Sequence, residues 1–481
     1  MNELNMKNLL ILFSFISTLF FSNSLLAQSK KDSKPNVLFI MVDDMNDWVN
    51  AFGGHPQAIT PNIDKVAKKG IMFKNAYCSA PLCNPSRTSL LTGLRPSTTG
   101  VYGNVEHFRD EEGFADIVTL PQHFGANGYT TVASGKIFHS PRGNKEVPKP
   151  GSDPGSFQTE KYSKLGTTFP DKSLRQSHGI NFDQKGIKKN FKKAFDWYGI
   201  EDTTEETNDW QNAEYCADFL KENHDKPFFL ACGIFRPHLP WYAPKKYFDM
   251  YDVETIKLPA VIENDLNDLG KGGNKLASPT LHRELVEKGL WKEAVRAYLA
   301  SLTFADECVG QVIDALDNSQ YKDNTIIVIM GDHGWHLGEK EFWGKNTLWE
   351  RSAKTPLIIF DPRTKGGKQV TTIVSLLDIY PTLTEMCGLP QNKSNEGSSI
   401  YDLVKNPKKK SNKMAVTSKD KGFHTIRSNQ YRYISYPDGT EELYDHNIDP
   451  NEWENVVKKD NYKDALDLMR AALKEKISVS N

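Results

Sequence analysis

The sequence has few cysteines, almost no net charge and a single long apolar run. Six cysteines in 481 residues are too sparse for a disulfide scaffold, and none has a spacing that would bind structural zinc. The 60 basic and 61 acidic side chains nearly cancel, which argues against a dedicated nucleic-acid-binding protein. Aromatic residues make up 11% of the chain, so the composition is that of a folded protein rather than a disordered one.

The apolar run lies near the N-terminus. Lys7 precedes the run Leu9–Phe21, which is shorter than a membrane span and is followed by small polar residues and Ala27. This pattern predicts a signal peptide, residues 1–27, with an uncleaved anchor as the alternative. No second run follows. We therefore expect an exported protein, periplasmic or secreted, with no membrane span once the signal is removed.

Further along the chain, buried-strand patterns alternate with helical patterns. Asn36–Val42 is a continuous apolar run, typical of a strand that is buried on both faces. In Trp291–Leu316, apolar residues recur at intervals of three and four, which predicts a helix. This alternation predicts an α/β fold whose mainly parallel sheet has helices on both faces. The other predicted strands are Thr130–Ala133, Pro227–Cys232, Thr325–Met330 and Pro356–Phe360.

The composition changes near residue 396. Short alternating strands near His424–Arg427 and Tyr431–Tyr436, and a helix near Asp460–Ile477, predict a small antiparallel sheet with a closing helix. We therefore divide the chain into a catalytic α/β domain, 28–395, and a C-terminal subdomain, 396–481. Residues 141–196 carry 12 basic and 6 acidic side chains, which indicates either a solvated insertion or a basic rim for an anionic substrate.

Acidic residues follow two of the predicted strands. Asp43 and Asp44 come after the first strand, and Asp332-His333 come after the strand that begins at Thr325. Ligands of open α/β sheets bind outside the carboxyl ends of the strands, so these residues can share one site. Carboxylate oxygens suit Ca²⁺ or Mg²⁺. Two unrelated helix caps are the alternative explanation.

Cys83 lies at the predicted start of a helix. Pro85 suits the first turn of this helix and Gly93 suits its end. A helix N-terminus favours anions, and Arg87, one turn further on, can reach the same place. An isolated cysteine is most often a small buried apolar residue. In these surroundings Cys83 is also a candidate nucleophile.

The segment Cys83-Asn84-Pro85-Ser86-Arg87 resembles the sulfatase signature, in which this cysteine is oxidised to Cα-formylglycine. Gly128–His139 resembles the second sulfatase signature, and both occur in order between the two acidic pairs. The resemblance runs from about Asn36 to about Asn455. Asn84 departs from the family pattern, which usually has Ser, Thr, Ala or Gly there. Among sulfatases, the sequence is most similar to iduronate-2-sulfatases, through Gly135–His139, Arg236–Pro240, Asp332–Trp335 and Trp343–Lys345.

The resemblance implies an alkaline-phosphatase-like fold, a mixed sheet flanked by helices with a small C-terminal antiparallel-sheet subdomain. It also implies one Ca²⁺ ion, bound by the formylglycine derived from Cys83 and by carboxylate and imidazole groups. The implied metal ligands are Asp43, Asp44, Cys83, Asp332 and His333. The residues implied around the sulfate are Arg87, Lys136, His139, His238 and Lys345.

Each implied role has a chemical reason. Arg87 and Lys136 can neutralise the sulfate oxygens, and one hydroxyl of hydrated formylglycine can attack sulfur. His139 is then the proton acceptor, and His238 or Lys345 is the donor to the departing sugar oxygen. The second hydroxyl expels sulfate. The expected substrate contacts are Asn104, His107, Trp335 and His336, with core packing as the alternative for the tryptophan.

The sequence therefore predicts an exported sulfatase that acts on heparin-like chains, ulvan or another polysaccharide. The sulfate that it is expected to remove is the 2-O-sulfate of a uronic acid. Its expected partners are a sulfated glycan and a formylglycine-generating enzyme, with no nucleic acid. A phosphate or phosphonate ester hydrolase of related fold is one alternative. A catalytically silent glycan-binding protein with unmodified Cys83 is another.

Overall fold

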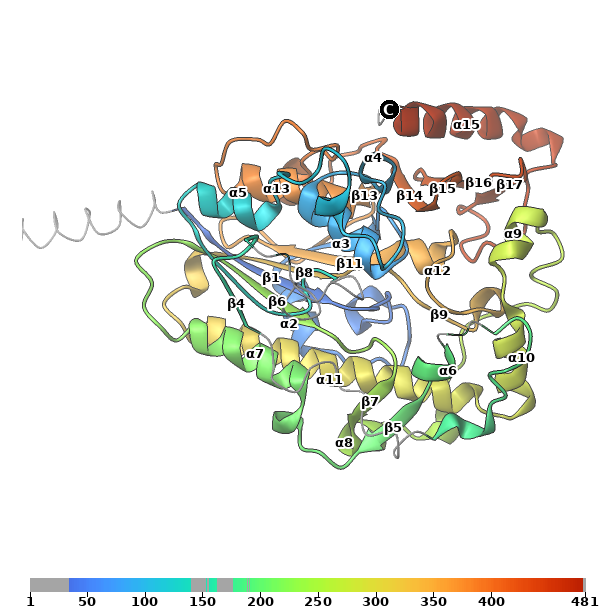
Figure 1. Ribbon diagram of the computed structural model, residues 1–481, viewed down its shortest axis with the longest axis horizontal. Coiled ribbons are helices and arrows are strands. Elements are labelled where there is room, and N and C mark those ends of the chain that lie inside the picture. The colour runs from blue at the N-terminus through green and yellow to red at the C-terminus, as the bar shows by residue number, and fades with distance from the viewer. Residues whose placement is uncertain are drawn as a thin grey trace, which may run out of the picture.

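The computed structural model describes residues 34–139, 153, 155–161, 176–187, 189 and 191–478. The predicted signal peptide and much of segment 141–196 lie outside these residues. A nine-stranded sheet forms the centre of the molecule (Figure 1). Its main path, in spatial order, is β12 (Lys368–Val370), β2 (Ile71–Tyr77), β11 (Lys354–Phe360), β8 (Thr325–Gly331), β1 (Asn36–Val42), β6 (Phe228–Ile234), β3 (Thr130–Gly135) and β4 (Thr159–Lys161). A short ninth strand, β13 (Val374–Ser375), pairs with β2.

The sheet is mixed rather than wholly parallel. Strand β1 pairs in parallel with both β8 and β6, whereas β11 runs antiparallel between β8 and β2. The register of β11 shifts between Thr355 and Leu357, because the intervening Pro356 has no N–H to donate. Strand β2 was absent from the sequence prediction, since Lys74 and Asn75 interrupt its apolar run.

Helices cover both faces of the sheet (Figure 1). Alternate residues of β1 enter two separate apolar cores, Leu38 and Ile40 on one face and Val37 and Phe39 on the other. The first face is covered by α2 (Pro61–Lys69), α7 (Asn208–Phe219) and α11 (Trp291–Asp317). The second is covered by α3 (Cys83–Thr92), α5 (Leu120–Ala126) and α13 (Ile379–Met386). The predicted helix Trp291–Leu316 is confirmed as α11.

The C-terminal region forms an antiparallel sheet of β14 (Ala415–Asp420), β15 (Phe423–Arg427), β16 (Tyr431–Ser435) and β17 (Glu441–Asp445). Apolar side chains of these strands point to both faces of the sheet. One face is covered by α15 (Lys463–Ser478) and the other by α9 (Lys271–Leu276). The sheet docks on the main body, where the Ser418 N–H donates to the Ser79 carbonyl oxygen at 2.8 Å. The predicted antiparallel subdomain is confirmed, although the sequence indicated only β15, β16 and the helix.

The remaining elements are short. Two pairs of strands lie outside the main sheets, β5 (Trp197–Ile200) with β7 (Trp241–Pro244) and β9 (His336–Leu337) with β10 (Trp343–Gly344). The other α-helices are α4 (Pro96–Thr99), α6 (Phe191–Ala194), α8 (Lys245–Asp249), α10 (Pro279–Glu287), α12 (Glu350–Ala353) and α14 (Tyr401–Lys405). Within the part of the chain that the structure describes, no helix is long and apolar enough to span a membrane.

Candidate active site

The predicted site residues meet at one edge of the main sheet because their strands end side by side. Asp43 and Asp44 follow β1, Asp332 follows β8, and Lys136 follows β3. Val42 of β1 is in register with Gly331 of β8, so the two acidic segments leave the sheet together. The shared edge that the sequence predicted from its apolar runs is therefore present.

Cys83 is fully buried at the start of α3. It is the first residue of the helix, with Leu82 as the N-cap, whereas the sequence placed it just before the helix. Gly93 ends the helix in the left-handed conformation (φ 77°), as expected for a glycine after the last turn. The helix N-terminus adds partial positive charge at Cys83, where an anionic group would be favoured.

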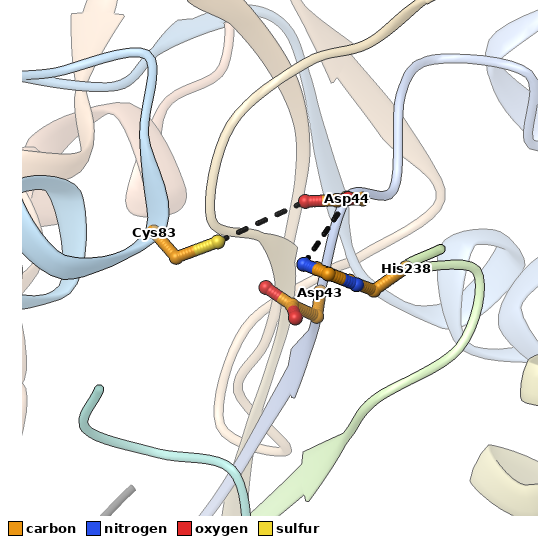
Figure 2. Close-up of side chains that lie close together, drawn as sticks. All are labelled: Asp43, Asp44, Cys83 and His238. Atoms are coloured by element: carbon orange, nitrogen blue, oxygen red, sulfur yellow. Dashed lines mark hydrogen bonds and ion pairs between the residues drawn. The ribbon is translucent and has the colours of Figure 1, made fainter. Parts of the chain in front are cut away.

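Three groups from distant segments surround the Cys83 sulfur. Lys345 Nζ lies 2.8 Å from Sγ, His333 Nε2 lies at 3.4 Å and Asp44 Oδ1 at 3.9 Å. Figure 2 shows Cys83 facing Asp44, with Asp43 and His238 beside them. Burial would raise the pKa of the Cys83 thiol, but Lys136, Lys345 and His333 outweigh it and hold this pKa well below its usual value. The surroundings therefore favour negative charge at position 83.

Arg87 joins two of the carboxylates. Its Nη2 lies 3.0 Å from Asp43 Oδ1 and its Nε lies 2.9 Å from Asp332 Oδ2, with all three side chains buried. The guanidinium also donates to the carbonyl oxygens of Lys136 and Ile137. A planar fork of five donors suits this bridge, which a lysine could not make. Arg87 thus fixes the ends of β1, β8 and β3 relative to one another.

The two aspartates after β1 are each paired with a lysine. Lys136 contacts Asp43 Oδ2, and Lys345 contacts Asp44 Oδ1. Burial would raise the pKa of Asp43, yet Lys136 and Arg87 lower it far below its usual range. Asp44 has a left-handed backbone (φ 59°), and its N–H donates to Asp332 Oδ1 at 3.1 Å. This turn points both carboxylates at Cys83.

The donor atoms fit a hard divalent cation. Ligand atoms of Asp43, Cys83, Asp332 and His333 lie within 4.8 Å of one another, and so do those of Asp43, Asp44, Cys83 and His238. Asp44 Oδ2 is buried and has no hydrogen-bond partner within the described part of the chain, so it has an open coordination position. Three buried carboxylates are the chemistry that Ca²⁺ prefers. Asp43, Asp44, Asp332 and His333 would hold the ion.

Two further histidines border the site. His238 Nδ1 lies 2.6 Å from the Leu239 carbonyl oxygen, which can only accept, so Nδ1 carries a proton. Its Nε2 faces Asp44 Oδ2 at 3.8 Å. His139 is near Cys83, and burial lowers its pKa. Because its Nδ1 is buried without a partner among the described residues, the His139 ring keeps one nitrogen for a bound molecule.

A loop at residues 103–106 lies beside the start of α3. The Asn84 amide donates to the carbonyl oxygens of Gly103 at 2.9 Å and Glu106 at 2.7 Å. In return, Asn104 Oδ1 accepts the Asn84 N–H at 3.0 Å. Asn104 thereby lies beside the start of α3, and its contact with substrate stays a prediction. His107 is held by Arg109 N–H and lies 3.7 Å from Asp153, and its predicted contact remains a prediction.

Two predicted substrate contacts, Trp335 and His336, are buried in the structure. His336 is fully buried, with Nδ1 3.1 Å from the Glu339 carbonyl oxygen and Nε2 2.8 Å from Thr347 Oγ1. Trp335 is also buried, and Lys345 Nζ covers its ring at 5.5 Å from the centroid. After His333 the chain turns into the interior, and the contact of these two side chains with a substrate stays a prediction.

Sequence reasoning missed three supporting residues. Tyr298 of α11 donates to the Asp44 carbonyl oxygen at 2.9 Å and accepts the Asn46 N–H, which fixes the turn after β1. Asp209 accepts the N–H groups of Phe235 and Arg236 and so anchors the loop that carries His238. Neither has a local signal, because each contact joins distant segments. Ser86 was visible inside the signature and donates to the Asp332 carbonyl oxygen at 2.6 Å.

Comparison with known families identifies two matching regions. The family described as Sulfatase matches residues 35–389, which cover most of the chain and the whole site. The family described as N-sulphoglucosamine sulphohydrolase, C-terminal, matches residues 338–479. The second match overlaps the first and includes the sheet β14–β17.

Individual relatives agree with this result. A protein named sulfatase from Formosa agariphila is 38% identical over 451 residues, covering 92% of this chain and 87% of the relative. Human iduronate 2-sulfatase is 30% identical over 392 residues, covering 74% of this chain and 69% of the relative.

Solved structures share the fold at lower identity. A 2-O GAG sulfatase superposes with a TM-score of 0.70 at 21% identity, covering 93% of each chain. Phosphonate monoester hydrolase of Agrobacterium radiobacter has a TM-score of 0.72 at 20% identity, covering 93% of this chain and 96% of that one. The fold alone therefore does not separate sulfate from phosphonate chemistry.

Proposed function

Since the chain belongs to the sulfatase family and is a sulfuric ester hydrolase, we propose that it removes the 2-O-sulfate of a uronic acid in a sulfated glycan. The proposal includes export through the signal peptide 1–27, conversion of Cys83 to formylglycine by a maturating enzyme, and one bound Ca²⁺ ion. Heparin-like chains and ulvan are both candidate glycans.

The observation that carries the proposal is the set of groups around Cys83. Three carboxylates and three cations, Arg87, Lys136 and Lys345, converge on one buried residue at a helix N-terminus. Once oxidised to formylglycine and hydrated, residue 83 would supply the oxygen nucleophile, and a Ca²⁺ ion held by the carboxylates would add positive charge to the site. A buried, cation-rich site of this kind stabilises charge that develops on transferred oxygens.

The chain's own residues have distinct parts in the reaction. Arg87 orients the carboxylates and, with Lys136, faces the place where the sulfate oxygens would lie. His139 has an unpartnered buried nitrogen and can accept a proton from the attacking oxygen. His238 Nε2, held toward the site by the Nδ1 contact, can deliver a proton to the departing sugar oxygen, as can Lys345. Burial of these groups excludes bulk water.

The preference for a uronic acid 2-O-sulfate rests on similarity to iduronate 2-sulfatase and on the motifs that carry it. The segment that ends at His139, the loop that carries His238 and the segment that carries Lys345 all reach the site. Because the reacting position is enclosed, we infer action at chain ends. Equal release from internal sugars of long chains would contradict this inference.

Two other functions remain to be tested against this one. A phosphonate ester hydrolase of the same fold would release phosphonate faster than sulfate from matched esters. A silent glycan-binding protein would keep an unmodified Cys83 thiol. The lysine, arginine and histidine set around Cys83 is intact, which favours a working sulfatase.

The experiment is sulfate release from an unsaturated uronate 2-O-sulfate disaccharide, with Cys83→Ala as the control. Release by the parent alone would support the linkage and the nucleophile together. The mass of the peptide spanning Cys83 gives the extent of conversion. A converted enzyme that hydrolyses an aryl sulfate but not this disaccharide would overturn the proposed specificity without affecting family membership.

A further inference from the structure

Two lysines from distant segments face one aromatic ring at the edge of the C-terminal sheet. Lys275 of α9 and Lys419 of β14 place their ammonium groups 5.6 Å and 5.2 Å from the ring centroid of Phe423, in β15. Phe423 is buried, Lys419 is half-buried and Lys275 is exposed. Each distance is within the range of a cation–π contact, so the ring attracts both cations.

The position of this lysine pair follows from the packing of α9. This helix lies across the sheet face that contains Phe423 and Tyr436, whose rings are 6.1 Å apart in an edge contact. A Cβ at Gly272 would lie 2.3 Å from Tyr436, so only glycine allows α9 to approach this closely. The close approach brings Lys275 over Phe423. In β14 and β15, Ser418 pairs with His424 and Asp420 pairs with Phe423, so Lys419 lies in the register shift between them. The contact of its ammonium group with the Phe423 ring places it beside the same ring as Lys275.

The two ammonium groups repel each other. Burial lowers the pKa of Lys419, Asp420 acts in the opposite direction, and Lys275 lowers this pKa further. Neither lysine makes an ion pair within 4.0 Å of a carboxylate among the residues described in the structure, and Asp420 is the nearby acidic group that acts on Lys419. Two neighbouring cations without a paired carboxylate, one of them partly desolvated, form a place where an added anion is favoured.

The lysine pair lies close to the reacting residue along the chain. Ser418, next to Lys419, donates its N–H to the Ser79 carbonyl oxygen at 2.8 Å. Ser79 precedes Cys83 by four residues, a chain length of at most about 14 Å. A second link runs through Leu348, which packs in the same apolar cluster as Phe423 and follows Lys345 by three residues. These contacts place the lysine pair next to the two segments that carry Cys83 and Lys345.

We propose that Lys275 and Lys419 form a distal subsite that binds a second anionic group, a sulfate or carboxylate, on a sugar beyond the one that is desulfated. This inference rests on the proposed function and gives the enzyme a preference for charged oligosaccharides over single sugars. Phe423 holds the two ammonium groups in place, so the subsite is formed before the substrate binds. Rigid placement lowers the entropy cost of binding.

Binding to a catalytically inactive protein tests the subsite without requiring turnover. On a Cys83→Ala background, the affinity for a heparin-derived tetrasaccharide is measured by calorimetry and compared with that for the matching disaccharide. We expect the tetrasaccharide to bind at least tenfold more tightly. Lys275→Ala and Lys419→Ala should each weaken its binding about fivefold, the scale of a partly exposed charge pair. The disaccharide should be affected less than twofold.

Matched variants exclude a general charge effect. Lys421 is exposed in the turn between β14 and β15, so Lys421→Ala removes one charge from the same hairpin and should change tetrasaccharide affinity less than twofold. The double variant Lys275→Arg with Lys419→Arg should keep most of the affinity. Raising the salt concentration should reduce the preference for the tetrasaccharide in the parent and not in the double alanine variant.

Three results would overturn the subsite. The first is that the inactive parent binds the tetrasaccharide and the disaccharide with equal affinity. The second is that the lysine variants lose affinity equally for both oligosaccharides. The third is that Lys421→Ala weakens tetrasaccharide binding as much as Lys419→Ala does. Failure of the proposed function would appear separately. In that case, parent enzyme whose Cys83 has been converted to formylglycine would release no sulfate from the disaccharide. The melting temperature of each variant shows whether a loss comes from misfolding.

Discussion

The Lys345 ammonium group lies 2.8 Å from the Cys83 sulfur and also contacts Asp44, so one cation serves both the nucleophile position and a carboxylate of the site. Burial would lower the pKa of Lys345, but Asp44 and Cys83 raise it above its usual value. Lys345 is therefore a fixed positive charge at the position where charge develops during sulfate transfer.

Replacing Lys345 with methionine keeps most of the length of the side chain and removes this charge. We expect kcat to fall by about 10²–10³-fold, the usual cost of losing one group that stabilises transition-state charge. The assay is aryl sulfate hydrolysis, with rates divided by the formylglycine content at position 83. Lys340→Met makes the same change in the neighbouring segment, where the lysine bonds Asp265 instead. If kcat fell in Lys340→Met and stayed at the parent value in Lys345→Met, Lys345 would have no part in the reaction.

Asn84 links the signature segment to the loop 103–106, and Asn84→Ala removes both of its side-chain hydrogen bonds. We expect KM for the disaccharide to rise about fivefold or more while kcat per formylglycine changes little, because the loop carries Asn104 and not the nucleophile. The two constants are measured on disaccharide and on a small aryl sulfate. A fall in kcat on both substrates, with KM unchanged, would show that Asn84 acts on the chemistry and not on the loop.

Arg87 is the only group that the structure shows bonded to both Asp43 and Asp332 within its described residues. Arg87→Lys keeps the charge but cannot make the two-ended bridge, so one buried carboxylate loses its partner. We expect a loss of about 3–5 kcal/mol in the free energy of unfolding, measured by urea denaturation. Arg470→Lys is the matched control, because its pairs with Glu441 and Asp467 are exposed and should contribute less than about 1 kcal/mol.

Much of the site follows from local sequence. Apolar runs located β1 and β8, and the carboxyl ends of parallel strands bring Asp43 and Asp332 together whatever the remaining topology. The burial of His336 and the residues that were missed depend on long-range packing. His336 follows Asp332 closely in sequence, yet the turn after His333 sends it to the interior. The contact of Tyr298 with Asp44 joins residues 254 positions apart, and no local pattern encodes it.

The fold shows the same division. The period of α11 is visible in the sequence, because one helix buries a regular stripe of side chains. The antiparallel direction of β11 is not visible, since a fully buried strand has the same apolar run in either direction. Strand β14 was missed because its pairing with β15 and its contact with Ser79 are decided by tertiary structure.

Removal of the metal should abolish activity reversibly if the three carboxylates hold Ca²⁺. Dialysis against EDTA should reduce sulfate release to background, and Ca²⁺ should restore it. Asp332→Ala should neither bind nor respond to Ca²⁺, because Asp332 belongs to the set of converging ligand atoms. Metal content is measured alongside the rate. Full activity of calcium-free protein, or of Asp332→Ala, would exclude this role.

Asp306 of α11 provides a pH test of stability away from the site. Its carboxylate accepts the N–H groups of Asn62 at 3.0 Å and Ile63 at 2.8 Å, at the first turn of α2. Burial raises the pKa of Asp306 to about 7, although these hydrogen bonds act in the opposite direction. In the unfolded chain this pKa is about 3.9, so between about pH 4 and pH 7 the folded protein holds a proton that the unfolded chain releases.

The contribution of Asp306 to stability is therefore complete below about pH 4 and is lost as the pH rises to about 7. Asp306→Asn removes this dependence on pH. The unfolding free energy of the parent minus that of the variant should therefore fall as the pH rises. The slope is at most about 1.4 kcal/mol per pH unit, the limit for one proton. Asp314→Asn, exposed on the same helix, is the control and should show no such slope. Urea denaturation at pH 5, 6, 7 and 8 measures the difference. A constant difference across this range would mean that Asp306 is ionised throughout, and that its hydrogen bonds to α2 outweigh its burial.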